Sequence, residues 1–266
     1  VSDGAEAIVQ STYDTLEAFP DRLLLAENVI WSTDPDGLYS SHRIISPMTN
    51  KGPSVYGPPT GKRVSVRTIA DCFVQDGMIT REWLIRDTLP IVTQLGLDPL
   101  EIAKQQRQGL SGTTHEYHQS ELARTTSEST HQSVHWAEQA LSARWTGSND
   151  IERFFAPYAV SYPGPLAWLS GRDAIKHHGM ATLGGLQPSS VRVDHVATQP
   201  WGHEGEEMAV RWTMTAEHSG PYLGLKPKTE QRVAILGSVH WRIVDGKIAS
   251  EWLVFDAMGV LAQLID

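Results

Sequence analysis

The residues whose types and spacing could carry chemistry lie in a segment that the chain contains twice. DGKIASEWLVFDAMGVLAQL at 245–264 aligns without gaps with DGMITREWLIRDTLPIVTQL at 76–95, and nine of the twenty positions are identical. Each copy predicts a tight Asp-Gly hairpin turn followed by a strand. Each strand ends in an aspartate, Asp256 in the later copy and Asp87 in the earlier one. The repeat therefore presents a carboxyl at the end of an apolar strand two times.

The surroundings predicted for Asp256 would suit proton transfer. Because side chains alternate along a strand, Ile248, Trp252 and Val254 are expected to share its face. Apolar neighbours raise the pKa of a carboxyl, since desolvation disfavours the charged form, and general acid–base catalysis at neutral pH needs such a group. A two-residue turn would also pair three residues of the preceding strand with this one: Trp241 with Ser250, Val239 with Trp252 and Ile235 with Asp256.

A second titratable residue ends the apolar face of another strand. In residues 208–218 that face ends in His218, and Asn50 aligns with it in the first copy. A carboxyl and an imidazole in an aromatic pocket could abstract a proton next to the carbonyl of a small, mostly apolar substrate. His218 or Arg211 would then hold the oxygen that gains charge. The expected substrate-contacting residues are Asn50, His42, Trp83, Arg211, Trp212, Trp241 and Trp252.

Each of these residues also has a purely structural interpretation, and His218 and Asn50 could simply face a sheet edge or a loop. Asp256 and Asp87 directly precede apolar segments, so either could be the N-cap of a short helix. Trp83 and Trp252 could be core, and a mid-strand arginine such as Arg211 usually pairs with a carboxylate. Glu82 and Glu251 are predicted on the opposite strand face from the aspartates, at the surface or in a contact between units.

Bulk composition narrows the function classes. The formal net charge of -9 over 266 residues argues against nucleic acid or an anionic membrane as the partner. The single cysteine, Cys72, fits a reducing compartment and predicts a cytoplasmic protein. No signal peptide and no membrane span are predicted. Some of the eleven histidines lie close together in the chain, but none is joined by a carboxylate at HExxH-like spacing. Nucleotide-binding motifs and a serine-hydrolase elbow do not occur, so neither metal nor cofactor is predicted.

The order of the predicted elements gives an α+β class with two units. Ala5–Ala18 has helical spacing, and the segment 21–31 resembles 152–162, so the repeat extends upstream of the hairpins. Residues 99–108 are expected to be helical, 109–114 to be a flexible linker and 119–145 to be the opening helix of the second unit. We predict two domains, at 1–110 and 119–266.

The motifs together resemble a known family. YGPPTGKRV at 56–64, DGKI at 245–248 and the double EWL...D......QL resemble the SnoaL-like polyketide cyclases, a branch of the nuclear transport factor 2-like superfamily. The resemblance implies two tandem cone-shaped domains, each with helices packed on a curved antiparallel sheet around a pocket that needs no cofactor. It also implies that the aspartate after EWL, here Asp256 and Asp87, acts as the acid/base. In the cyclases this drives an aldol ring closure, whereas related branches isomerise, dehydrate, open epoxides or only bind ligands.

Differences between the copies suggest unequal roles. The second unit has GLKPKTEQRV where the first has GPPTGKRV, but it keeps its aspartate and His218. The first unit has Asn50 there and shorter opening helices. We therefore expect the second unit to hold the more complete site, and the two units to form an internal pseudo-dimer with Glu82 and Glu251 near its seam; further homo-oligomerisation stays open. The expected function is a cofactor-independent cyclase, isomerase or dehydratase acting on a small apolar molecule. The alternatives are hydrolysis of an epoxide or ester, and a non-catalytic ligand-binding or assembly module.

Overall fold

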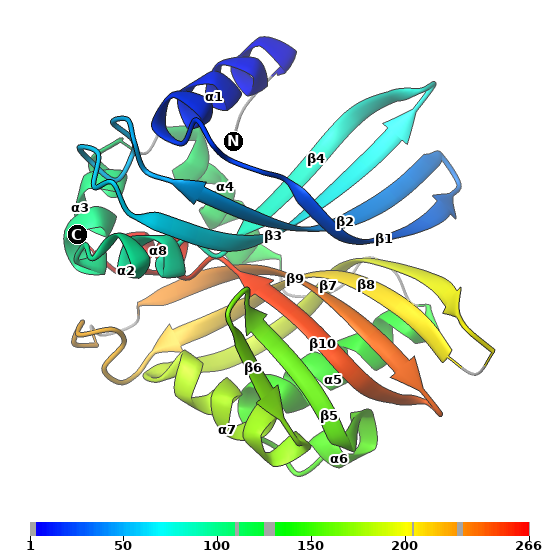
Figure 1. Ribbon diagram of the computed structural model, residues 1–266. Helices are drawn as coiled ribbons and strands as arrows, with labels where there is room; N and C mark the ends of the chain where they lie inside the picture. Colours follow the sequence, from blue (N-terminus) through cyan, green and yellow to red (C-terminus); the bar gives the residue numbers. More distant parts are fainter. Residues whose placement is uncertain (1–3, 110–111, 125–130, 204, 228–230, 266) are drawn as a thin grey trace.

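Two β-sheets stack face to face in the computed structural model, which describes residues 4–109, 112–124, 131–203, 205–227 and 231–265 (Figure 1). The first sheet has the order β1-β2-β3-β4, with strands Leu25–Asp34, Gly37–Thr49, Arg63–Gln75 and Met78–Arg86. The second sheet has the order β6-β5-β10-β9-β8-β7. Its strands in that order are Ala167–Ser170, Phe155–Gly164, Lys247–Phe255, Arg232–Val244, Gly205–His218 and Leu186–Trp201.

Helices cover the outer sides of the two sheets unequally. On the second sheet, α5 (Gln132–Thr146), α6 (Ile151–Phe154) and α7 (Arg172–Leu183) pack on the side away from the first sheet (Figure 1). On the first sheet, α1 (Gly4–Ala18) lies over one end only. Three further helices gather at one edge of the molecule: α2 (Leu89–Leu95), α3 (Pro99–Gly109) and α8 (Ala257–Leu264). The α+β prediction is confirmed, and none of the described helices combines the length and apolarity that crossing a bilayer requires.

The connection between the units differs from the expected linker. Residues 112–123 form helix α4, and only residues 110 and 111 of the expected linker at 109–114 lie outside the described residues. The single helix expected at 119–145 is divided between α4 and α5, with residues 125–130 not described. Helix α3 contacts α8, where Arg107 Nη1 donates to the carbonyl oxygen of Ala262 at 3.1 Å. The main hydrophobic cluster accordingly contains residues of both units, among them Met48, Ile102 and Trp212.

The predicted register of β10 is wrong by one residue because the strand contains a β-bulge. Between Ile248 and Ser250 the pairing with β9 shifts, so that Ser250 lies opposite Arg242 and Trp252 opposite His240. A bulge inserts one extra residue and exchanges the faces of the residues beyond it. Ile248 therefore joins the main core, whereas Trp252 and Val254 face the first sheet. The second sheet also departs from the all-antiparallel expectation, since β10 pairs with β5 in parallel.

The same bulge overturns the expectation for Glu251. Its carboxylate is fully buried inside the second unit instead of lying at the surface or the seam. It accepts hydrogen bonds from Arg144 Nε at 3.0 Å, Ser161 Oγ at 2.7 Å and Trp241 Nε1 at 3.2 Å. Glu82, at the matching position of the first unit, is exposed. Residues with the same place in the repeat thus have opposite environments.

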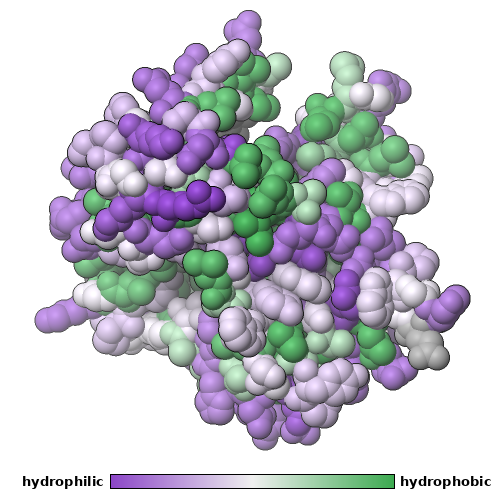
Figure 2. All heavy atoms as spheres, in the orientation of Figure 1, coloured by the Kyte–Doolittle hydropathy of each residue, from purple (hydrophilic) through white to green (hydrophobic). Residues whose placement is uncertain are grey.

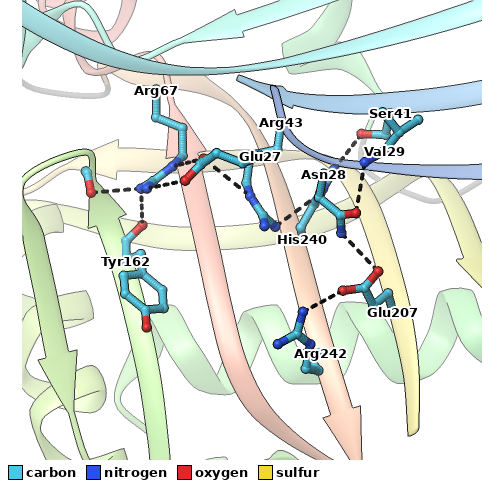
Figure 3. A network of polar contacts seen from close by, with 11 residues as sticks. Glu27, Asn28, Val29, Ser41, Arg43, Arg67, Tyr162, Glu207, His240 and Arg242 are labelled. Atoms are coloured by element: carbon cyan, nitrogen blue, oxygen red, sulfur yellow. Dashed lines mark hydrogen bonds and ion pairs between the residues drawn. The ribbon is translucent and has the colours of Figure 1, made fainter. Parts of the chain in front are cut away.

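The seam between the sheets is a polar network (Figure 3). Glu27 forms ion pairs with Arg43 (3.4 Å) and Arg67 (2.8 Å), and Arg67 Nη1 also donates to the carbonyl oxygens of Tyr162 and Gly164 on β5. The guanidinium of Arg43 stacks 3.8 Å from the ring centre of Trp252. Such contacts fix the orientation of the two sheets because each buried charge needs its partner.

A buried histidine extends this network from β9. His240 Nε2 lies 2.7 Å from Ser41 Oγ, which donates to Asp71 Oδ1 at 2.5 Å. Arg43 Nη1 lies 3.4 Å from the other ring nitrogen of His240. Burial and the charge of Arg43 hold the pKa of His240 well below its usual range. The seam therefore contains a neutral histidine between a cation and a hydroxyl.

Candidate active site

The two repeat aspartates begin the edge helices in different ways. Asp256 is the N-cap of α8, and its Oδ1 accepts the backbone N–H of Gly259 at 2.9 Å. Asp87 lies one residue before Thr88, the N-cap of α2, and accepts the N–H of Leu89 at a longer 3.3 Å. Each carboxyl thus has a capping contact, and the contact of Asp256 is the shorter.

The two carboxyls are also coupled electrostatically across the units. Burial raises the pKa of Asp256. Burial first, and the negative charge of Asp256 second, raise the pKa of Asp87 to about 7. Like charges in mutual reach cannot both ionise freely, so such a pair holds a proton at a pH where an ordinary aspartate has lost it. Asp256 also acts on Tyr56, whose pKa is raised to about 12, mainly by burial.

A cavity of about 480 Å³ opens in the first unit, and neither aspartate of the pair is among its lining residues. Apolar side chains form part of its wall, and two arginines, Arg22 and Arg86, lie among them. Arg86 directly precedes Asp87 in the chain, although Asp87 itself is not a lining residue. Its walls come from α1, the connection from α1 to β1, the 53–56 loop, strands β2 to β4 and helix α2: Ser11, Asp14, Thr15, Glu17, Ala18, Phe19, Arg22, Met48, Pro53, Ser54, Val55, Tyr56, Val66, Thr68, Arg86 and Ile91. Figure 2 shows the molecular surface hollowed between α1 and the far end of β4, with apolar side chains on both sides.

The strand register shows which residues of the first unit occupy the places of large aromatic side chains in the second unit. In the first sheet Ile44 pairs with Thr68, which pairs with Arg86. At the corresponding places of the second sheet, Trp212 pairs with Gly237, which pairs with Phe255. The repeat alignment likewise places Cys72 where the second unit has Trp241. Three bulky aromatic side chains are therefore replaced by smaller or charged ones.

The second unit fills the corresponding interior with aromatic side chains. Trp145, Trp212 and Trp241 are at most 1% exposed, and Trp145 packs with ring centres 5.6 Å from both Trp212 and Phe255. Trp212 and Trp241, expected along a substrate pocket, lie in this packed core and beside neither cavity described here. The expectation that the second unit holds the more complete pocket is therefore not supported by the geometry.

A second cavity, of about 360 Å³, lies between the units. Two of the predicted substrate-contacting residues, Trp83 and Arg211, line it. The guanidinium of Arg211 stacks 3.9 Å from the ring centre of Trp83. Arg211 Nε forms an ion pair with Asp71 at 3.5 Å, and His195 Nε2 lies 2.8 Å from Asp34 Oδ2. This cavity is more polar than the first, and the carboxylates around it already have cationic or imidazole partners: Asp34, Asp71, Glu121 and Asp194.

The remaining predicted site residues are dispersed. His218 ends the buried stripe of β8 as expected, with Nδ1 3.3 Å from Gln231 Oε1. Asn50 closes the 50–61 loop by accepting from Thr60 N–H and donating to the Gly52 carbonyl. His42 lies on β2 with Nε2 2.9 Å from Ser40 Oγ, and Trp252 stacks on Tyr162 at the seam. The structure does not gather these four residues into one site.

Arg22 and Arg86 line the cavity but are not among the site residues predicted from the sequence. A signal for Arg86 was present, because the repeat places an arginine where the other copy has Phe255. Within the described residues, no group of three or more histidine, cysteine, aspartate or glutamate side chains could hold a metal ion. From its own residues the cavity can stabilise an anion by guanidinium groups, whereas the carboxyls suited to proton transfer, Asp87 and Asp256, are not part of its wall.

Comparison with known proteins connects the sequence of the second unit to a family. Residues 131–264 match the sequence pattern of the SnoaL-like polyketide cyclases. Among solved structures, TsrD from Streptomyces laurentii is 19% identical over 51% of this chain and 98% of its own, with a TM-score of 0.39. IdmH from Streptomyces antibioticus is 22% identical over 50% and 99%, with a TM-score of 0.38. An LEH-like epoxide hydrolase from M. tuberculosis is 13% identical over 49% and 83%, with a TM-score of 0.36. A search of the curated proteins gave no match.

Proposed function

The chain belongs to the SnoaL-like polyketide cyclase family, and from that premise we propose that it is a cofactor-independent acid/base enzyme for a small, mostly apolar carbonyl compound. The observation that carries the proposal is the coupled pair Asp87 and Asp256. A carboxyl with a pKa of about 7 is half ionised at neutral pH, which is the condition for taking up and returning a proton in one cycle. The site is proposed at the junction of the units, beside the first unit's cavity.

The proposed step is a proton transfer at the carbon next to the carbonyl. The ionised member of the aspartate pair takes that proton, the C–H electrons form a carbon–carbon double bond, and the carbonyl oxygen becomes an enolate oxygen. Arg86, which lines the cavity one residue before Asp87, stabilises this negative oxygen. Return of the proton to another carbon gives isomerisation, and attack of the enolate on a second carbonyl gives cyclisation.

Deuterium uptake tests this step without knowledge of the natural substrate. We expect the protein to accelerate exchange of the α-hydrogens of 2-tetralone in D2O, followed by proton NMR. The rate should rise with pH, with a midpoint near 7. Asp87→Asn and Asp256→Asn should each slow the catalysed exchange at least tenfold, because general acid–base catalysis typically contributes about 100-fold or more. The control is Glu82→Gln, an exposed carboxylate of the same strand. Equal rates in wild type and both aspartate variants would sink the proposal.

A second candidate function rests on the cap of α8. Asp256 accepts the Gly259 N–H, so it has a structural role that requires no catalysis. A non-catalytic small-ligand-binding or assembly module would use the first unit's cavity and keep the aspartates only to position α2 and α8. In that case the asparagine variants would not change the exchange rate of any probe, and Asp256→Ala would lower stability through the lost cap.

A further inference from the structure

We propose that the molecule bound in the first unit's cavity is an anionic amphiphile, with a carboxylate held by Arg22 and Arg86 and an apolar body lying against Met48, Val66 and Ile91. This deepens the proposed function, since it assigns a substrate class to the same cavity. The binding part of the proposal needs no catalysis and can be tested separately.

The first observation is that two guanidinium groups line one cavity. Arg22 and Arg86 both contribute to its wall, and the positive charge of Arg86 acts unfavourably on Arg22. Burial is the main cause that lowers the pKa of each group. Two desolvated positive charges in mutual reach are costly unless an anion compensates them.

The second observation is that the protein supplies no carboxylate partner for either arginine. Neither forms an ion pair within the described residues, and Arg86 Nε is buried without a hydrogen-bond partner. Buried, unbonded nitrogens also occur on other arginines, but each of those forms an ion pair with a carboxylate: Arg43, Arg144, Arg172, Arg211 and Arg242. Glu82 attracts Arg86 only from a distance, and the lining carboxylates Asp14 and Glu17 lie on exposed positions of α1.

The third observation concerns the rest of the cavity wall. Met48 and Val66 are at most 5% exposed, Ile91 is 3% exposed, and all three belong to the main core cluster. A cavity of about 480 Å³ lies within the range that holds small organic ligands, about 300–1,000 Å³. The guanidinium group binds a carboxylate through paired N–H donors. A ligand with a carboxylate at one end and an apolar body therefore matches the two arginines and the apolar part of the cavity wall.

Isothermal titration calorimetry with a matched pair of probes tests the proposal. Decanoate and 1-decanol share the alkyl chain and differ in the charge of the head group. We expect wild type to bind decanoate at least tenfold more tightly than decanol. Arg22→Gln and Arg86→Gln should each weaken decanoate binding at least tenfold and leave decanol binding within about twofold. Arg63→Gln removes an exposed arginine of β3 outside the cavity and should change neither value.

Equal affinity for the two probes in wild type would overturn the proposal, as would decanoate binding that survives both cavity substitutions. Circular dichroism and thermal unfolding establish that each variant is folded. If Arg86→Gln does not fold, the decisive comparison is between wild type and Arg22→Gln, which changes a partly exposed arginine. The double variant Asp87→Asn/Asp256→Asn should retain decanoate binding. If wild type binds decanoate as expected but its deuterium exchange does not depend on the aspartates, the proposed catalysis is rejected and the carboxylate site is kept. If the exchange depends on the aspartates but decanoate does not bind as expected, only the carboxylate site is rejected.

Discussion

The interiors of the two units are built from matching positions of the repeat, but aromatic side chains fill the second and a cavity opens in the first. In the second unit Trp212, Trp241 and Phe255 fill the space above the sheet, and the buried charges of Arg144 and Glu251 compensate each other. In the first unit smaller or charged side chains stand at those positions, and Arg86 faces a cavity without a carboxylate partner. The order β1-β2-β3-β4 matches β7-β8-β9-β10, and the register of the last three strands is retained. At the matched positions, a few side-chain volumes and one charge therefore distinguish a packed core from an interior with a cavity.

The largest expected effect comes from exchanging the residues at this distinguishing position. Phe255→Arg would place an unpaired guanidinium against Trp145 and should cost on the order of 5 kcal/mol, or prevent folding, because an aromatic contact is lost and a charge is buried. Arg86→Phe should instead stabilise the chain by about 1 kcal/mol, since it removes a partly buried, unpaired charge. Urea unfolding at 25 °C measures both. Similar effects of the two substitutions would contradict the contrast between the interiors.

The next effect tests the two glutamates of the repeat. Glu251→Gln should lower the free energy of unfolding by about 3–5 kcal/mol, because Arg144 would remain buried without a counter-charge. Glu82→Gln is the matched control on the exposed strand face and should change the free energy by less than about 0.5 kcal/mol. A cost below about 1 kcal/mol for Glu251→Gln would show that Arg144 finds compensation elsewhere in the core.

The contrast between these glutamates marks how far sequence reasoning reached. The repeat, the hairpins, the α+β class and the stripe ending in His218 follow from alternation and turn chemistry, which act locally. The bulge between Ile248 and Ser250 has no such local signal, and it moved Glu251 from the expected surface into the core. Its partner Arg144 is distant in the sequence, so only the folded chain reveals the pair. The cavity was missed for a different reason: the alignment showed Arg86 opposite Phe255, but its meaning depends on side-chain volumes across three strands.

The pH dependence of stability should reveal the raised pKa of Asp87. A carboxyl whose pKa is raised on folding binds more protons in the native state than in the unfolded state between its ordinary pKa and the raised one. For Asp87 this range extends from 3.8 to about 7, so stability should fall as the pH rises through it. The fall should be on the order of 2 kcal/mol, allowing for the screening of a partly exposed group. Asp87→Asn should remove it, and parallel pH profiles of wild type and variant would argue against a raised pKa.

The smallest expected effect concerns the helix caps, where the copies differ in geometry and not in residue type. Asp256→Ala removes the acceptor for Gly259 N–H and should cost about 1 kcal/mol near pH 4, where the charge of either carboxyl is least important. Asp256→Asn keeps a capping oxygen and should cost little, which separates the cap from the charge. Asp87→Ala loses only the 3.3 Å contact to Leu89 and should cost less than Asp256→Ala. Equal costs for the two alanine variants would mean that both aspartates cap equally. The different first turns of α2 and α8 would then have no energetic consequence, and the asymmetry between the units would be confined to their interiors.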